Sequence, residues 1–360
     1  MRIRFIVNGL GLGNSTRCHS VIQQLVAKGC EVSVATSGNG LWYFDDKVEI
    51  SQLDKLESLN YESKDGKINI FKTIVSTPRL VSTIRRNSRQ LTEILKNERP
   101  DAVVIDSEYG ILPMKRLKIP VVALNNSDVV VHSRRKYSPL PISIRAQFYA
   151  VEMLDYMFHK ILPNIVISPS LDMDLPSTGT KFKRVAVIVR KQYRATLSTA
   201  RSKKVVIMLS GSVFGSRVII KKKSYNFQLD IIGRDAPEGW QDTPGIRYHS
   251  KLLDNLKLLQ DADLVVVNGG FSAVSEAVSL KKPMVVIPVP HHAEQWINGR
   301  TVEELGIGLV AEEADLENKM IEAYGRIDEF RDAYEKISPH PVGAETAAQI
   351  ILDFVAERSG

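Results

Sequence analysis

Residues 3–35 read IRFIVNGLGLGNSTRCHSVIQQLVAKGCEVSVA. The apolar run Ile3–Asn8 predicts a buried strand, Ser15–Lys28 predicts a helix, and Glu31–Ala35 predicts a second strand. A glycine-rich turn joins the first strand to the helix. A strand, a helix and a strand in this order form a crossover unit, so the stretch predicts parallel strands and an α/β fold.

The same alternation continues through both halves of the chain. Further strands are predicted in the first half at Ala102–Ile105, Val121–Leu124 and Ile165–Ile167, and in the second half within KKVVIMLSGS, FQLDIIG, ADLVVVNGG and PMVVIPVP. Between the halves lies a stretch rich in Ser, Thr, Pro and basic residues, which is typical of a connection between domains. The predicted boundaries are 1–167 for a first Rossmann-like domain, 168–200 for the connection, 201–340 for a second Rossmann-like domain and 341–360 for a C-terminal helix.

Composition restricts the class of protein. Of the 360 residues, 44% are apolar and 25% are charged, which predicts a soluble globular chain with enough apolar residues to bury hydrophobic cores. No window reaches the ~18 apolar residues of a membrane span, and the N-terminus lacks a cleavage site, so we expect a cytoplasmic protein. The net charge of +7 favours an anionic partner: a nucleotide diphosphate, a lipid phosphate or nucleic acid. The two cysteines are too few for a disulfide framework or a thiolate metal site.

The glycine-rich turn fits neither common nucleotide loop. No lysine follows the glycines, as a triphosphatase loop requires, and the spacing is G-x-G-x-G rather than G-x-G-x-x-G. Asn14 or Ser15 is the expected helix cap. We therefore interpret Gly11, Gly13 and Asn14 as a wall of an acceptor site, the alternative being a tight turn without a ligand.

A sharper signal lies at NGGFSAVSEA, residues 268–277, after a very apolar run. Gly269 and Gly270 predict a strand-to-helix turn whose free amides, with the Ser272 hydroxyl, suit a diphosphate. Glu276 lies about one turn further, where a carboxylate can accept both hydroxyls of a ribose. The alternative for Glu276 is a solvated position on the helix surface.

The next predicted strand leads into HHAEQW, residues 291–296. Glu294 and Gln295 offer a carboxylate beside a carboxamide, a pair suited to sugar hydroxyls. The adjacent histidines His291 and His292 have no third ligand nearby, so we expect no metal here.

The stretch GGFSAVSEAVSLKKPMVVIPVPHHAEQWINGR resembles the donor-binding signature of GT-B glycosyltransferases. Within them it is similar to the branch of the bacterial enzyme that adds N-acetylglucosamine to lipid-linked peptidoglycan precursors, and above all to its little-characterised archaeal and bacterial members. In the first half, GLGNSTR, PDAVVIDSEYG and KIPVVALNNSD match further motifs of this branch. The resemblance runs from about Met1 to Gly308. It implies two domains that face each other across a cleft, with the C-terminal helix packing back on the first domain.

The resemblance assigns roles to individual residues. It implies that Gly269, Gly270 and Ser272 contact the diphosphate of a nucleotide sugar, that Glu276 binds the ribose, and that Glu294 and Gln295 bind the sugar. It also implies that the turn formed by Ser210, Gly211 and Ser212 faces the diphosphate and that the loop carrying His249 surrounds the base. We expect a UDP-sugar as substrate, no tightly bound cofactor, no metal and no nucleic acid. One in-line displacement would invert the anomeric carbon.

The first half departs from the family where related enzymes have a histidine base, because this chain has Asn14. An amide cannot take a proton near neutral pH. Asp106 and Glu108 follow a buried strand and are the expected catalytic residues, and His19 is a weaker candidate. The alternative for Asp106 is a helix cap. An acceptor that is already ionised, such as a phosphate, would need no base.

The stretch at 129–163 mixes Arg134, Arg135, Lys136 and Arg145 with apolar side chains. This composition suits docking on an anionic membrane near a lipid-linked acceptor, at the inner face of the membrane, but also suits an ordinary packed helix. Two other functions remain open at this stage. One is a sugar-nucleotide 2-epimerase of the same fold, and the other is a catalytically silent partner subunit that only binds the nucleotide sugar.

Overall fold

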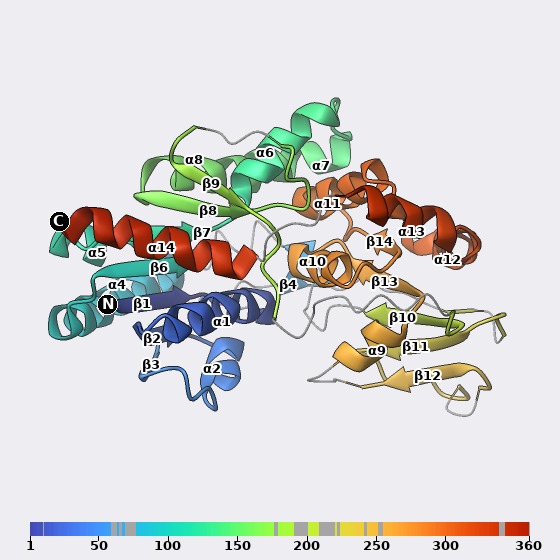
Figure 1. Ribbon diagram of the computed structural model, residues 1–360, viewed down its shortest axis with the longest axis horizontal. Helices are drawn as coiled ribbons and strands as arrows, with labels where there is room; N and C mark the ends of the chain where they lie inside the picture. The colour runs from blue at the N-terminus through green and yellow to red at the C-terminus, as the bar shows by residue number, and fades with distance from the viewer. Residues whose placement is uncertain are drawn as a thin grey trace. The chain divides into compact units, whose positions relative to one another are not determined.

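The chain forms two compact units, each built on a parallel sheet (Figure 1). The computed structural model describes residues 1–9, 11–58, 63–64, 67–68, 77–175, 179–190, 201–208, 220–221, 224–240, 243–250, 255–337 and 343–359. The first unit comprises Met1–His132, Met153–Arg190 and His340–Gly360, and the second comprises Ser133–Glu152 and Lys191–Pro339. These units differ from the sequence-based domains at residues 133–152, which we predicted in the first domain and which group with the second unit, and at residues 168–190, which we predicted in the connection and which group with the first unit.

Seven parallel strands form the main sheet of the first unit, in the order β3-β2-β1-β6-β7-β8-β9. Their bounds are β1 Arg2–Val7, β2 Glu31–Thr36, β3 Gln52–Lys55, β6 Ala102–Asp106, β7 Val121–Leu124, β8 Ile165–Pro169 and β9 Phe182–Val185. A small antiparallel pair, β4 Ser63–Lys64 and β5 Lys67–Ile68, lies outside this sheet. The strand order reverses between β1 and β6, which is where ligands bind in such sheets.

Helices cover both faces of the first sheet. They are α1 Leu12–Ala27, α2 Asn39–Phe44, α4 Thr77–Glu98, α5 Leu112–Leu117, α6 Ser127–Lys136, which crosses into the second unit, α8 Met153–Ile161 and α14 Gly343–Ser359. Alternate residues of β1 point to opposite faces: Phe5 packs in the core with α1 and α14, and Ile6 packs in the core with α4 and α5. Burial on both faces explains why Phe5, Ile6 and Val7 follow one another without a polar residue.

Six parallel strands form the sheet of the second unit, in the order β12-β11-β10-β13-β14-β15. Their bounds are β10 Lys204–Met208, β11 Gln228–Ile232, β12 Ile246–His249, β13 Leu264–Asn268, β14 Met284–Ile287 and β15 Gly308–Val310. The helices are α7 Ile142–Gln147, the π-helical η1 Phe148–Glu152, α9 Leu256–Asp261, α10 Phe271–Ser279, α11 Ala293–Glu304, the 3₁₀ turn η3 Glu313–Asp315, α12 Leu316–Gly325 and α13 Ile327–Lys336. Here the strand order reverses between β10 and β13.

The predicted α/β class with two Rossmann-like parallel-sheet domains is confirmed. The predicted start of the first helix is wrong, because α1 begins at Leu12 rather than Ser15. Its cap is Gly11, in extended conformation and without a side-chain hydrogen bond, so neither Asn14 nor Ser15 caps it. Gly13 and Asn14 therefore lie inside the first turn of the helix.

The described residues contain neither a candidate membrane-spanning helix nor a candidate metal site. In these parts of the chain no helix is both long enough and apolar enough to cross a membrane. The same parts contain no group of three or more His, Cys, Asp or Glu residues that could hold a metal ion.

A buried arginine ties three elements of the first unit together. The Arg4 side chain lies in the middle of β1 and has no exposed surface. Its guanidinium pairs with Asp54 of β3, and its Nη1 atom lies 3.1 Å from Glu98 Oε2 at the end of α4. Both carboxylates keep about a fifth of their surface in water. Arg4 therefore needs these two carboxylates as counter-ions, because its own side chain is out of contact with water, whereas water still solvates part of each carboxylate.

We expect the double variant Asp54→Asn/Glu98→Gln to lower the free energy of unfolding by ~3–5 kcal/mol, because it leaves a buried cation without an anion. Arg4→Met should cost less, because it removes the buried charge itself. Urea unfolding monitored by circular dichroism measures both. Glu57→Gln, at the exposed Arg86–Glu57 pair, is the matched control and should leave the midpoint unchanged. A larger loss for Arg4→Met than for the double variant would contradict this account.

Candidate functional site

The first candidate site lies where β1 and β6 end side by side. Their register pairs Val7 with Asp106, and the Asn8 amide donates to the Asp106 carbonyl over 3.0 Å. Gly9 follows β1, and a Cβ atom there would lie 1.6 Å from the Ser37 carbonyl oxygen. Only glycine therefore lets the loop pass this close to the end of β2.

Asp106 forms the centre of a buried polar cluster. Arg17 binds it through two contacts, Nε to Oδ2 at 2.9 Å and Nη2 to Oδ1 at 2.7 Å. The Cys18 thiol donates to the same carboxylate over 3.3 Å. Burial, followed by the Asp106 charge, raises the pKa of this thiol well above its ordinary value, which keeps the proton on sulfur. Asp106 has no exposed surface, and Arg17 contacts both of its carboxylate oxygens.

Asn14 is oriented by the same cluster. Its Oδ1 atom accepts from Arg17 Nη2 and its Nδ2 atom donates to the Asn8 carbonyl, both over 3.4 Å. The first turn of α1 contains no acidic residue. The loop therefore presents the amides of a helix N-terminus and an amide side chain, a neutral and donor-rich surface.

Glu108 differs from Asp106 in its surroundings. It follows β6 by two residues and is half-buried, and its Oε1 atom accepts from the Gly110 amide over 2.8 Å. Burial raises the pKa of this carboxyl above its ordinary value, and the backbone hydrogen bonds offset only part of that shift. A carboxylate with a raised pKa is a better base near neutral pH than an ordinary one.

His19 is packed away in the interface between α1 and α2. Its Nδ1 atom lies 3.0 Å from Tyr43 Oη, and its Nε2 atom lies 3.7 Å from Glu49 Oε2. Burial lowers the pKa of the ring. The Nδ1 atom is thus hydrogen-bonded, whereas the buried Nε2 atom has no hydrogen-bond partner among the described residues and only the longer contact to Glu49.

The second candidate site lies after β13, at the reversal of strand order in the second unit. Gly269 is in very close contact with α11: a Cβ atom there would lie 2.5 Å from the Gln295 carbonyl oxygen. Asn298 Nδ2 donates to the Gly269 carbonyl over 2.9 Å. Helix α11 is thereby held against the turn that starts α10.

The N-terminus of α10 offers amides without a protein cap. Gly270 is the cap residue, no side chain bonds to it, and the first turn contains no acidic residue. Ser272 lies in that turn, and Glu276 lies four residues later on the same face of the helix. Both side chains are half-buried. The arrangement suits an anion at the helix start and hydroxyls one turn further.

Gln295 and Glu294 begin α11 beside this turn. Gln295 Oε1 accepts from the Val289 amide over 3.0 Å, so its Nε2 group is the part left to donate to a ligand. His292 caps α11, and burial lowers the pKa of its ring below the ordinary value. His291 lies in the left-handed backbone region at φ +67°.

His249 ends β12 and is fixed by a buried carboxylate. Its Nε2 atom lies 2.7 Å from Oδ1 of Asp230, which is 2% exposed in β11. The pair orients the imidazole at the carboxyl edge of the sheet. Ser210, Gly211 and Ser212 lie outside the described residues.

Sequence reasoning missed two supporting residues here. Asp230 could have been suspected, because an acidic residue inside the apolar run FQLDIIG needs a partner. Gln147, which binds the first amide of α11 over 2.9 Å, gives no sequence signal.

The apolar residues at 129–163 fall into two groups. Leu140, Ile144 and Phe148 are buried, whereas Ile142 of α7 is 85% exposed. On α8, three residues spaced along one side are exposed: Leu154, Met157 and Ile161.

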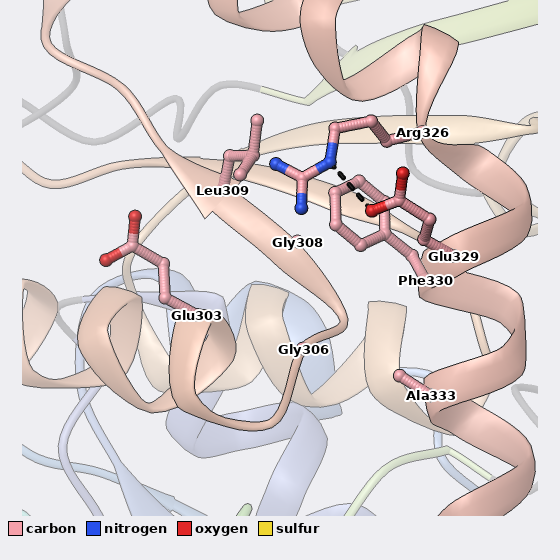
Figure 2. A pocket seen from close by; sticks show the side chains of 8 residues that line it. All are labelled: Glu303, Gly306, Gly308, Leu309, Arg326, Glu329, Phe330 and Ala333. Atoms are coloured by element: carbon pink, nitrogen blue, oxygen red, sulfur yellow. Dashed lines mark hydrogen bonds and ion pairs between the residues drawn. The ribbon is translucent and has the colours of Figure 1, made fainter.

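A surface pocket of about 340 Å³ lies at the β15 edge of the second sheet and contains none of the predicted site residues (Figure 2). Its lining is Glu303, Gly306, Gly308, Leu309, Arg326, Glu329, Phe330 and Ala333. Figure 2 shows the Arg326–Glu329 ion pair, with Nε 2.9 Å from Oε2. Glu303 accepts from the Val310 amide over 3.1 Å, which covers part of the sheet edge. These internal contacts give the pocket a structural role.

Comparisons with known proteins agree with the α/β fold of the two units. Residues 1–326 match the model of the family described as glycosyl transferase family 1. A glycosyltransferase of Methanosarcina acetivorans, described as uncharacterized, is 27% identical over 329 residues, covering 86% of this chain and 85% of that protein. The UDP-N-acetylglucosamine–N-acetylmuramyl-(pentapeptide) pyrophosphoryl-undecaprenol N-acetylglucosamine transferase of Geobacillus kaustophilus is 31% identical over 171 residues, covering 43% of this chain and 47% of that one.

A solved UDP-glucosyltransferase from Polygonum tinctorium superimposes with a TM-score of 0.71 at 14% identity, covering 99% of this chain and 98% of that one. This likeness supports the GT-B fold. The resemblance to the branch of lipid-linked N-acetylglucosaminyltransferases is confirmed. The chain therefore belongs to glycosyl transferase family 1 and is a sugar-transferring enzyme that uses a nucleotide-sugar donor.

Proposed function

We propose that this enzyme transfers a sugar from a UDP-sugar to an acceptor hydroxyl, with inversion and without a metal ion. The observation that carries the proposal is the uncapped N-terminus of α10, at the reversal of strand order in the second unit. Its amides, Gly269, Gly270 and Ser272 receive the diphosphate, and Glu276 accepts the ribose hydroxyls. The helix dipole then stabilises the leaving diphosphate, the task that a metal performs in other transferases.

The sugar is bound by the start of α11. Because Gln295 Oε1 is occupied by the Val289 amide, Gln295 donates through Nε2 to a sugar oxygen. Glu294 accepts from a sugar hydroxyl. His249, paired with Asp230, lies at the end of the outer strand β12, where we expect the nucleotide base of the donor to bind. Ser210, Gly211 and Ser212, which the family resemblance assigns to the diphosphate, are further contacts in this proposal.

Glu108 is the proposed general base. The acceptor oxygen attacks the anomeric carbon, Glu108 takes its proton, and the bond from that carbon to the diphosphate oxygen breaks. Asp106 is less suited to this role, because Arg17 binds both of its oxygens. In this proposal Asp106 holds Arg17, and Arg17 holds Asn14 in the first turn of α1, on the side of the acceptor. Gly11 and Gly13, at the start of the same helix, have no side chain and leave room for the acceptor.

The donor assignment predicts a nucleotide-dependent shift in stability. UDP at about a hundredfold over its dissociation constant should stabilise the protein by ~2.7 kcal/mol, which is a rise of a few degrees in the unfolding temperature. The shift should disappear in Glu276→Ala and persist in Glu335→Gln, an exposed control on α13. Absence of a shift with UDP in the wild type, or a shift with NAD alone, would contradict the donor assignment.

Assays for transfer separate the proposed reaction from its alternatives. UDP-glucose and UDP-N-acetylglucosamine, offered with candidate acceptors, should yield UDP and a glycosylated acceptor of inverted configuration. Conversion of the UDP-sugar into its 2-epimer without any acceptor would replace the proposal by an epimerase. Tight binding of UDP-sugars with no turnover of any acceptor would indicate a silent binding subunit.

The base assignment predicts a specific pH profile. Because burial raises the pKa of Glu108, kcat/KM should fall as the pH drops through a value above 4.5, the ordinary pKa of this carboxyl. In Glu108→Gln the acid limb should vanish and kcat should fall by about 10²–10⁴-fold. Asp106→Asn should lower the unfolding temperature, since Arg17 loses its counter-ion, yet keep the acid limb. The reverse pattern would make Asp106 the base.

A lipid-linked acceptor is the proposed substrate class, reached through contact with an anionic membrane. Leu154 and Ile161 of α8 are each more than 60% exposed, and the intervening Lys160 is exposed as well. Apolar side chains beside a cation suit the surface of an anionic bilayer.

This proposal predicts binding to vesicles at low salt. The wild type should sediment with vesicles that contain phosphatidylglycerol, and Leu154→Ser/Ile161→Ser should reduce the bound fraction at least severalfold, given the transfer free energy of two large side chains. Ile321→Ser on α12 removes an apolar residue that is 40% exposed from the second unit and should have no effect. Equal losses in both variants, or no binding by the wild type, would refute membrane contact.

A further inference from the structure

The segment Ser133–Glu152 packs with the second unit, although it lies between two stretches of the first unit. Helix α7 and the π-helical turn η1 contact α11. At this contact Gln147 Oε1 accepts from the backbone amide of Ala293 over 2.9 Å. Ala293 is the first residue of α11 and directly precedes Glu294 and Gln295. The first amides of a helix have no partner within it, so Gln147 supplies the missing acceptor from 146 residues away.

The orientation of the Gln147 side chain is fixed at its other end. Its Nε2 group donates to Glu152 Oε1 over 2.9 Å. Glu152 is 7% exposed, and an ionised carboxylate can only accept hydrogen bonds. The amide must therefore turn its nitrogen to Glu152 and its oxygen to Ala293. The two bonds select one orientation of Gln147 and connect η1 to the start of α11.

The loop before α11 needs such support. His291 adopts the left-handed conformation, which a side chain other than glycine rarely takes. Its Nδ1 atom lies 2.9 Å from the carbonyl oxygen of Ser143 in α7. The loop is thus attached to the 133–152 segment at two points, one on each side of His292. Gln295 in turn bonds back to the loop through Val289, so the shape of the loop determines where its Nε2 group lies.

We propose that Gln147 is a positioning residue for recognition of the donor sugar. By holding the Ala293 amide it sets the direction of the first turn of α11, and thereby the places of Glu294 and Gln295. This inference rests on the proposed function, in which these two residues bind the sugar of a UDP-sugar. It adds that selectivity for the sugar, and not affinity for UDP, depends on Gln147, a residue of the segment Ser133–Glu152.

The test compares affinities for UDP, UDP-glucose and UDP-N-acetylglucosamine by titration calorimetry on the full chain. In Gln147→Leu the affinity for UDP should stay within about twofold of the wild type. The ratio of the UDP-sugar dissociation constant to that of UDP should rise roughly five- to tenfold, the range expected for one lost hydrogen bond. In steady-state transfer the KM for the UDP-sugar should rise accordingly, while the acid limb of the pH profile keeps its place.

A charge-preserving exchange provides the rescue. Gln147→Glu alone brings a second carboxylate next to Glu152 and should disturb the ratio at least as much as Gln147→Leu. Combined with Glu152→Gln, the new carboxylate at 147 can accept from Ala293 while the new amide at 152 donates to it, so the ratio should return toward the wild-type value. If Gln147→Leu does not fold, the exchange compared with Gln147→Glu alone gives the same information.

Tyr137→Phe is the matched structural control. Tyr137 lies in the same segment and bonds to α11 further along, with Oη 3.2 Å from Thr301 Oγ1. Loss of this hydroxyl group should lower the unfolding temperature of the protein but leave the ratio of the UDP-sugar dissociation constant to that of UDP unchanged. An equal change of the ratio in Tyr137→Phe, or an unchanged ratio in Gln147→Leu, overturns the positioning role. Failure of the wild type to bind UDP at all would instead overturn the proposed function, and this inference with it.

Discussion

The ion pair between Arg17 and Asp106 is the constraint on which the first candidate site depends. It joins helix α1 to the end of β6, across 89 residues of sequence and inside a region without solvent. A buried carboxylate that is held in this way keeps its place, so it can orient Arg17 and, through it, Asn14. The same pairing occupies both oxygens of Asp106. The proposal of Glu108 rather than Asp106 as the base rests on this contact and on the burial that raises the pKa of Glu108.

The turn between β13 and α10 is fixed by close packing and a neutral hydrogen bond. The backbone at Gly269 approaches α11 so closely that a methyl group would collide with it, and Asn298 closes the contact with a neutral hydrogen bond. An anionic cap at the start of α10 would satisfy the free amides but would repel a diphosphate. A glycine cap has no side chain that would compete with a ligand for those amides. The two sheets share the same order over six strands, and the first has one strand more. In both units a glycine lets the loop after a strand pass close to a neighbouring segment, and in the first unit a buried ion pair is added.

Sequence reasoning could identify features that depend on neighbours in the chain. The strand before Asp106 and the turn at Gly269–Gly270 follow from local patterns. Strand β6 ends at Asp106, one residue beyond the predicted end at Ile105, and β13 ends at Asn268, directly before the predicted turn. The start of α1 was missed because the chain caps it with Gly11, which lacks the side-chain signal of Asn or Ser. The partners of Asp106 and Ala293 were missed because they lie 89 and 146 residues away, and a single sequence contains no record of such contacts. The roles of Glu276, Glu294 and His249 remain predictions.

The proposed influence of Gln147 has an upper limit set by the strength of one hydrogen bond. A net contribution of about 1 kcal/mol changes an affinity ratio by roughly fivefold, which is enough to tune selectivity between similar sugars but too little to switch binding on or off. A residue with this much influence can vary between related enzymes without loss of the fold. The segment Ser133–Glu152 would then be a place where donor selectivity changes while Glu276 and the α10 turn, which in the proposed function bind the part common to all UDP-sugars, stay the same.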